Sequence, residues 1–163
     1  MNAGTHTIGA LAAGTAVYWA GSLSFPGPEA AVYMAAVTGG GLLPDICQPF
    51  SWIGRRTRPV STMIQKVFGH RTITHSILFV AALYFCAGLI PYDWGMAVQY
   101  GITTGAVSHL LLDMMTPQGI HILYPVKQKI SFPLTTKTGS ITGEGTISFL
   151  MLCWIVYSGM HII

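Results

Sequence analysis

The stretch GITTGAVSHLLLDMM, residues 101–115, closes an apolar segment that is long enough to cross a membrane. His109 and Asp113 lie four residues apart, so one face of a helix carries both side chains. Near lipid such a pair is costly unless it is partnered or binds a cation. Gly101 and Gly105 are spaced so that a second helix can approach closely. We therefore predict a helix that packs within a bundle and carries a metal-binding pair at its end.

The composition favours a small polytopic membrane protein that forms one domain over residues 1–163. The chain is 52% hydrophobic and 8% charged, with a mean hydropathy of +0.56, whereas soluble domains carry about 25% charged residues. The net charge of +3 accompanies no aromatic-rich basic surface, so we expect no nucleic-acid partner. The three cysteines are far apart and form no C-x-x-C pair, which argues against a disulfide framework.

Five apolar segments predict an all-α bundle of about five transmembrane helices. Each segment approaches the roughly 20 residues that span a bilayer, although the second is short. Their approximate limits are residues 7–25, 30–43, 73–90, 95–115 and 146–163. All eight lysines and arginines fall in the connections 47–72 and 116–144. The positive-inside rule places these connections and the N-terminus in the cytoplasm of a multi-pass protein.

Two connecting segments are expected to have structure of their own. Within Pro59–Phe68, apolar residues recur at helical spacing and predict a short amphipathic helix. This helix either lies on the membrane surface or packs against the bundle, and the sequence leaves both placements open. In residues 129–142, alternating apolar residues precede a turn at residues 137–140, which predicts a small β-hairpin.

Seven residues with acid–base or metal-binding side chains fall at the ends of the predicted spans, all on one side of the bilayer. They are His6, Asp45, His70, His75, His109, Asp113 and Glu144. Histidine and carboxylate ligands together suit zinc, manganese or iron. The set exceeds the needs of one catalytic zinc, which indicates two ions about 3.5–4 Å apart or one ion with supporting residues. Such a site can activate water and stabilise the oxygens of an in-line displacement at phosphorus.

Several of these residues have more than one possible role. A single histidine near a helix end is more often interfacial or hydrogen-bonded than a ligand. His70 and His75 would point about 140° apart on a continuous helix, so they converge only if His70 precedes the helix. Glu144 is open as a ligand, a general base or a salt-bridge partner. Arg71 stands between candidate ligands and is the arginine best placed to bind phosphate.

These residues resemble the YdjM-like family of predicted inner-membrane, metal-dependent hydrolases over nearly the whole chain. The matching stretches are Thr5-His6, Leu42–Asp45, Gly69–Arg71, Thr74–Ser76 and Gly105–Gly119. The family is itself distantly similar to zinc-dependent phospholipase C and the P1-type nucleases, which hold a metal cluster with histidines, an aspartate and a His-x-x-x-Asp pair. Cys47 and His121 lie outside the pattern. The resemblance implies an inner-membrane, metal-dependent hydrolase, and the positive-inside rule places its site on the cytoplasmic side.

We therefore expect a membrane-bound metal-dependent hydrolase that cleaves a phosphoester of a lipid or other membrane-associated substrate with metal-activated water. Zinc is the expected metal, as one or two ions, and manganese is the alternative. The expected metal ligands are His6, Asp45, His70, His75, His109 and Asp113. Glu144 and His6 would also orient the attacking water, and Arg71 would bind phosphate. The rival functions are a divalent-metal transporter and a membrane scaffold stabilised by metal. An intramembrane metalloprotease is disfavoured because no H-E-x-x-H motif occurs.

Overall fold

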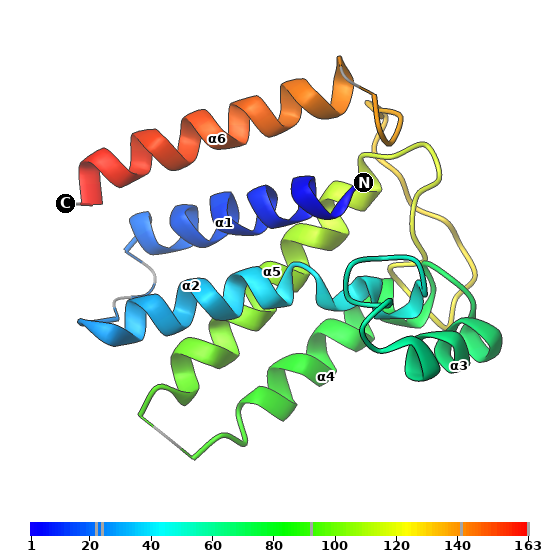
Figure 1. Ribbon diagram of the computed structural model, residues 1–163, viewed down its shortest axis with the longest axis horizontal. Helices are drawn as coiled ribbons and strands as arrows, with labels where there is room; N and C mark the ends of the chain where they lie inside the picture. The colour runs from blue at the N-terminus through cyan, green and yellow to red at the C-terminus, as the bar shows by residue number, and fades with distance from the viewer. Residues whose placement is uncertain (22, 24, 92, 141, 163) are drawn as a thin grey trace.

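Figure 1 shows a computed structural model in which long helices form a bundle and the larger loops gather at one end. The structure describes residues 1–163 except residues 22, 24, 92, 141 and 163. The α-helices are α1 (Ala3–Trp19), α2 (Pro28–Gly40), α3 (Arg58–Phe68), α4 (Ile77–Ala87), α5 (Gly95–Met114) and α6 (Gly143–Ile162). Two 3-10 helices, η1 (Leu43–Cys47) and η2 (Ile73–His75), follow α2 and precede α4.

Helix α1 occupies the middle of the bundle, with α6 on one side and α2 and α5 on the other (Figure 1). Helix α5 also packs against α4, and η1 contacts both η2 and α5. The N-terminus lies at the end where the loops gather, and the C-terminus lies at the opposite end. The start of α1, the end of α5 and both 3-10 helices therefore meet at one end of the molecule.

Glycines allow α2 and α5 to pack backbone against backbone. A Cβ atom at Gly105 would lie 2.0 Å from the carbonyl oxygen of Val37, and one at Gly40 would lie 2.2 Å from the carbonyl oxygen of Ile102. A Cβ atom at Gly101 would lie 2.7 Å from the carbonyl oxygen of Tyr33. No other residue fits at these distances, so the close approach predicted from Gly101 and Gly105 is confirmed.

The prediction of about five transmembrane helices is wrong. Among the described residues, only the helical stretch Pro28–Cys47 is both long enough and apolar enough to be a candidate membrane span. Helices α1 and α4 have 17 and 11 residues, fewer than the roughly 20 that a bilayer requires. Helices α5 and α6 have 20 residues each, but polar side chains such as His109 and Glu144 lower their hydropathy.

The predicted amphipathic helix is confirmed as α3, with Pro59 in its first turn. Ser61 is buried, whereas Val60, Met63 and Val67 are 47%, 62% and 67% exposed. The bundle therefore covers the polar side of α3 and leaves its apolar side uncovered. The sequence left two placements open for this helix, on the membrane surface or against the bundle. Packing against the bundle does not explain why the apolar side of the helix is exposed.

The predicted hairpin is also wrong, because the described residues contain no strand. A single antiparallel bridge joins Ile120 and Ile130. Beyond it, the backbone N–H groups of Phe132 and Thr136 donate to the carbonyl oxygens of Met114 and Met115, each at 2.8 Å. The end of a helix leaves carbonyl oxygens without helical partners. The segment after residue 130 therefore pairs with the end of α5 instead of folding back on itself.

Candidate metal centre

Five of the predicted metal ligands converge where the loops gather. They are His6 of α1, Asp45 of η1, His75 of η2, and His109 and Asp113 of α5. The side chain of Asn2 caps α1 by accepting a hydrogen bond from the Thr5 N–H at 2.9 Å, which places His6 in the first turn. Pro44 is the second residue of η1 and fixes the backbone one residue before Asp45. Two long helices and two 3-10 helices therefore supply the five side chains.

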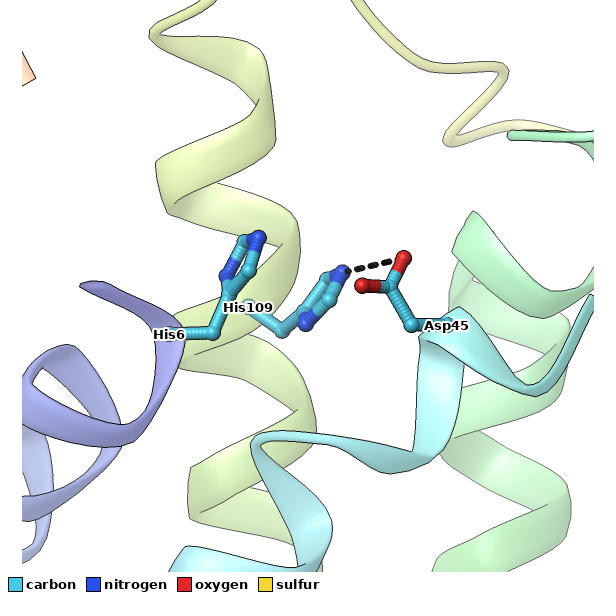
Figure 2. A group of neighbouring side chains, drawn as sticks. All are labelled: His6, Asp45 and His109. Atoms are coloured by element: carbon cyan, nitrogen blue, oxygen red, sulfur yellow. Dashed lines mark ion pairs between the residues drawn. The ribbon is translucent and has the colours of Figure 1, made fainter. Parts of the chain in front are cut away.

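The ring of His109 has one nitrogen fixed by the backbone and one directed at the other candidate ligands. Its Nδ1 lies 2.7 Å from the carbonyl oxygen of Gly41, which can only accept, so Nδ1 carries the proton. Its Nε2 lies 3.2 Å from Nε2 of His75 and 3.7 Å from Oδ1 of Asp45 (Figure 2). A carbonyl that fixes the tautomer and directs the other nitrogen inward is the usual support of a metal-binding histidine.

His75 and Asp113 form the charged centre of the site. Nε2 of His75 lies 3.3 Å from Oδ2 of Asp113, and both side chains are almost fully buried. Burial alone would lower the pKa of His75, but the hydrogen bonds and negative charges of Asp113 and Cys47 raise it to about 9. His75 is therefore protonated at neutral pH, and a metal cation at Nε2 would replace that proton.

Two further positively charged groups contact the second carboxylate oxygen of Asp113. Oδ1 accepts hydrogen bonds from the Met1 ammonium at 2.8 Å and from Arg71 at 3.2 Å. Burial raises the pKa of Asp113, but the neighbouring imidazoles of His6 and His75 and the ammonium hold it well below its usual range. Asp113 is therefore a carboxylate across the physiological range, which is the form that binds metal.

His6 provides the clearest test of whether the site fits a metal. Its ring stacks on that of His109, with centroids 3.6 Å apart and planes 10° from parallel (Figure 2). Nε2 lies 3.5 Å from Oδ1 of Asp113, yet neither buried ring nitrogen has a hydrogen-bond partner among the described residues. Buried polar atoms are rarely left unpaired. A divalent metal fits this donor set because it would bind a nitrogen that the protein leaves unpaired.

Two overlapping sets of side chains are close enough to hold an ion. One is His6, Asp45 and His109, and the other is His75, His109 and Asp113, with ligand atoms within 4.8 Å of one another in each set. His109 belongs to both sets but offers a single free nitrogen, because Gly41 occupies the other. His109 can therefore ligate one ion only, and a second ion would depend on the remaining residues.

His70 lies beside this centre and outside both sets. Its Nδ1 is 3.2 Å from Sγ of Cys47, and its ring meets that of His75 edge-on with centroids 5.5 Å apart. Cys47 is fully buried between the two histidines. Cys47 was not among the expected ligands, and its position two residues after Asp45 was the signal in the sequence that could have found it. A ligand role for His70 stays a prediction.

Glu144 also lies outside the two sets of ligands. Its carboxylate accepts hydrogen bonds from Oγ1 of Thr5 at 2.6 Å, from the backbone N–H of Asn2 at 2.8 Å and from the backbone N–H of Gly139. Burial raises the pKa of Glu144, but these hydrogen bonds outweigh burial and lower it. In the structure Glu144 joins the start of α1 to the loop before α6, and its role as ligand or base stays a prediction.

Arg71 is held at the edge of the centre with part of its hydrogen-bonding capacity unused. It is in the left-handed region at φ 59°, and His121 holds its carbonyl oxygen through N–H at 3.2 Å and Nδ1 at 3.0 Å. Its guanidinium donates to Oγ1 of Thr116 and Oδ1 of Asp113, whereas Nε has no partner among the described residues. A strained backbone held by neighbours is common at functional sites.

A cavity of about 460 Å³ opens over the centre. Asp45, His70 and Asp113 line it together with Arg55 and Arg71. The metal-binding oxygens and two guanidinium groups thus face the same space. Guanidinium groups suit phosphate because they can donate two parallel hydrogen bonds to its oxygens. An anionic group can therefore reach the ligands from this cavity.

Known proteins resemble this chain along most or nearly all of its length. The model of the YdjM inner membrane protein family matches residues 1–162. The chain is 34% identical to the uncharacterized protein YvsG of Bacillus subtilis, over 99% of this chain and 98% of that protein. It is 35% identical to the inner membrane protein YdjM of Escherichia coli, over 71% of this chain and 61% of that protein. No solved structure matches. The chain belongs to the YdjM inner membrane protein family.

Proposed function

We propose that this inner membrane protein is a metal-dependent hydrolase that cleaves a phosphoester on a membrane-associated substrate. The observation that carries the proposal is that three buried histidines and two aspartates form two overlapping sets that share His109, with His6 left without a hydrogen-bond partner among the described residues. His75, His109 and Asp113 would hold the metal, and Asp45 and His6 would complete its ligands. Zinc suits these nitrogen and oxygen donors, and manganese is the alternative.

The protein groups around the centre suit phosphate chemistry. A divalent ion bound there supplies a Lewis acid for a phosphoryl oxygen and makes water nucleophilic at neutral pH. Arg71 and Arg55 both line the cavity, and their guanidinium charges would neutralise phosphate oxygens there. Thr116 and His121 would keep the guanidinium and backbone of Arg71 in position.

The test combines metal analysis with an assay of turnover. Wild-type protein in detergent would be compared with His109→Ala and with His121→Ala, a control at a histidine outside the ligand sets. We expect one or two equivalents of zinc or manganese in wild type and His121→Ala by elemental mass spectrometry, and loss of most metal in His109→Ala. Hydrolysis of p-nitrophenyl phosphate or of phosphatidic acid would be measured in wild type and should be lost with the metal in His109→Ala. Well-folded wild type that binds no added metal, or that cleaves no phosphoester when loaded, would refute the proposal.

A further inference from the structure

We propose that the apolar groove between α2 and α5 binds the hydrocarbon chain of the substrate whose phosphate enters the polar cavity. This inference rests on the proposed function, because it assigns the chemical class of that substrate: a phosphate ester of a long-chain lipid. The groove has a volume of about 420 Å³. All the described residues that line it are apolar, among them Val32, Gly39, Leu43, Trp52, Val98 and Ile102.

Continuity with the polar cavity argues for the substrate's own chain as the occupant. Trp52 lines both the groove and the cavity over the metal centre. The guanidinium of Arg56 lies 3.7 Å from the centroid of the Trp52 ring and also donates to its carbonyl oxygen at 2.8 Å. This cation–π contact and hydrogen bond fix the ring between an anion-binding space and an apolar one. One amphipathic molecule can therefore occupy both spaces across Trp52.

The direction of the groove also fits a lipid chain. Leu43 and Trp52 lie near the metal centre, and Val32 lies toward the opposite end of α2. From Gly39 to Val32 alone the helix rises by about 10 Å. Val32, Gly39 and Leu43 belong to Pro28–Cys47, the stretch whose length and hydropathy suit a membrane span. A chain bound here would leave the polar cavity and continue along the most membrane-compatible helix.

Gly39 offers a way to fill the groove without disturbing the fold. A Cβ atom added at Gly39 would meet no heavy atom within 4 Å, whereas one added at the next residue, Gly40, would collide with α5. Leucine at position 39 would therefore occupy groove space only. Ala31 is exposed on the same helix and does not line the groove. Ala31→Leu is thus a matched control for Gly39→Leu.

The experiment measures binding directly, so it does not depend on turnover. Dodecyl phosphate brominated near the middle of its chain would be titrated against protein in maltoside micelles, with quenching of tryptophan fluorescence as the readout. We expect quenching in wild type and Ala31→Leu, and loss of the Trp52 contribution in Trp52→Phe. Each methylene kept from an apolar site weakens binding by roughly fourfold. Gly39→Leu, which would displace two or more, should weaken binding by at least about fifteenfold.

Three results would overturn the inference. Unchanged binding in Gly39→Leu would show that the chain lies elsewhere. Equal quenching by the brominated alcohol, which lacks phosphate, would show that the groove takes any bilayer chain. A change in oligomeric state in Gly39→Leu would show that a second copy of the protein covers the groove. Failure of wild type to hydrolyse any phosphoester refutes the proposed function, while the quenching results still decide what occupies the groove.

Discussion

Replacing His6 with phenylalanine should stabilise the metal-free protein and weaken its metal binding. His6 is 1% exposed, and both ring nitrogens lack hydrogen-bond partners among the described residues. Each buried unpaired polar group costs about 1–3 kcal/mol. Phenylalanine keeps the stacking on His109 and removes both nitrogens, at an overpacking cost of about 1 kcal/mol. We therefore expect His6→Phe to raise the free energy of unfolding in EDTA by about 1–3 kcal/mol.

Zinc should offset most or all of this gain, because wild type responds to zinc more strongly than the variant. At a free zinc concentration about 100 times the dissociation constant, binding stabilises wild type by about 2.7 kcal/mol. If loss of a ligand weakens affinity by about 100-fold, the same zinc stabilises His6→Phe by about 0.4 kcal/mol. Both proteins would be unfolded with denaturant in maltoside micelles at about pH 8, with and without zinc, following tryptophan fluorescence.

A second histidine provides the control for this comparison. His121→Phe should behave oppositely, because it loses a real hydrogen bond to Arg71 and leaves the metal ligands intact. We expect it to lose about 0.5–1.5 kcal/mol in EDTA and to keep the full zinc response. A His6→Phe protein that is destabilised in EDTA and retains the zinc response would refute the reasoning.

Three further predictions follow from the charges and the exposed surface. Asp113→Asn should destabilise the metal-free protein by about 3–5 kcal/mol in denaturant titrations, because it leaves buried positive groups unpaired; NMR should also show the pKa of His75 falling from about 9. In the folded protein the pKa of Glu144 lies below 4.5, the usual pKa of a glutamate. Glu144 therefore stabilises the fold fully at pH values above 4.5, and this stabilisation is lost as the pH falls through the lowered pKa of the folded state. Wild type should therefore exceed Glu144→Gln in stability at neutral pH, and the gap should close on acidification. Met63→Glu on the exposed side of α3 should weaken the contact of this helix with lipid. The measurement is the quenching of a fluorophore on α3 by brominated lipid, and most of that quenching should be lost. Ser61 is buried and is therefore unsuited to this test.

The sequence predicted where helices form better than how they relate to a membrane. Apolar runs in the sequence located α1, α2, α4, α5 and α6. Glycine spacing located the contact of α2 with α5. Length and hydropathy then failed as guides to the number of spans, since α4 has only 11 residues and α5 carries buried polar side chains. The hairpin failed because the carbonyl oxygens at the end of α5 compete for the N–H groups of Phe132 and Thr136.

The candidate site was predictable where it depends on local spacing. His109 and Asp113 share a face of α5 at the i, i+4 separation, and both reach the centre. His75 reaches the centre because it lies in η2, which turns the chain before α4 begins. The sequence allowed His70 and His75 to converge only if His70 preceded the helix, and both residues do precede α4. The carbonyl of Gly41 and the position of Cys47 depend on how η1 packs against α5, which no local pattern encodes.

The glycine contact between α2 and α5 also makes the metal centre sensitive to sliding of one helix along the other. Gly40 sits against α5, and the next residue supplies the carbonyl that orients His109. A slip of one residue would shift that carbonyl by about 1.5 Å, enough to break a hydrogen bond of 2.7 Å. Lateral pressure or membrane thickness that shears the bundle would thus act directly on the alignment of the candidate ligands, because the orientation of His109 depends on the register of α2 against α5.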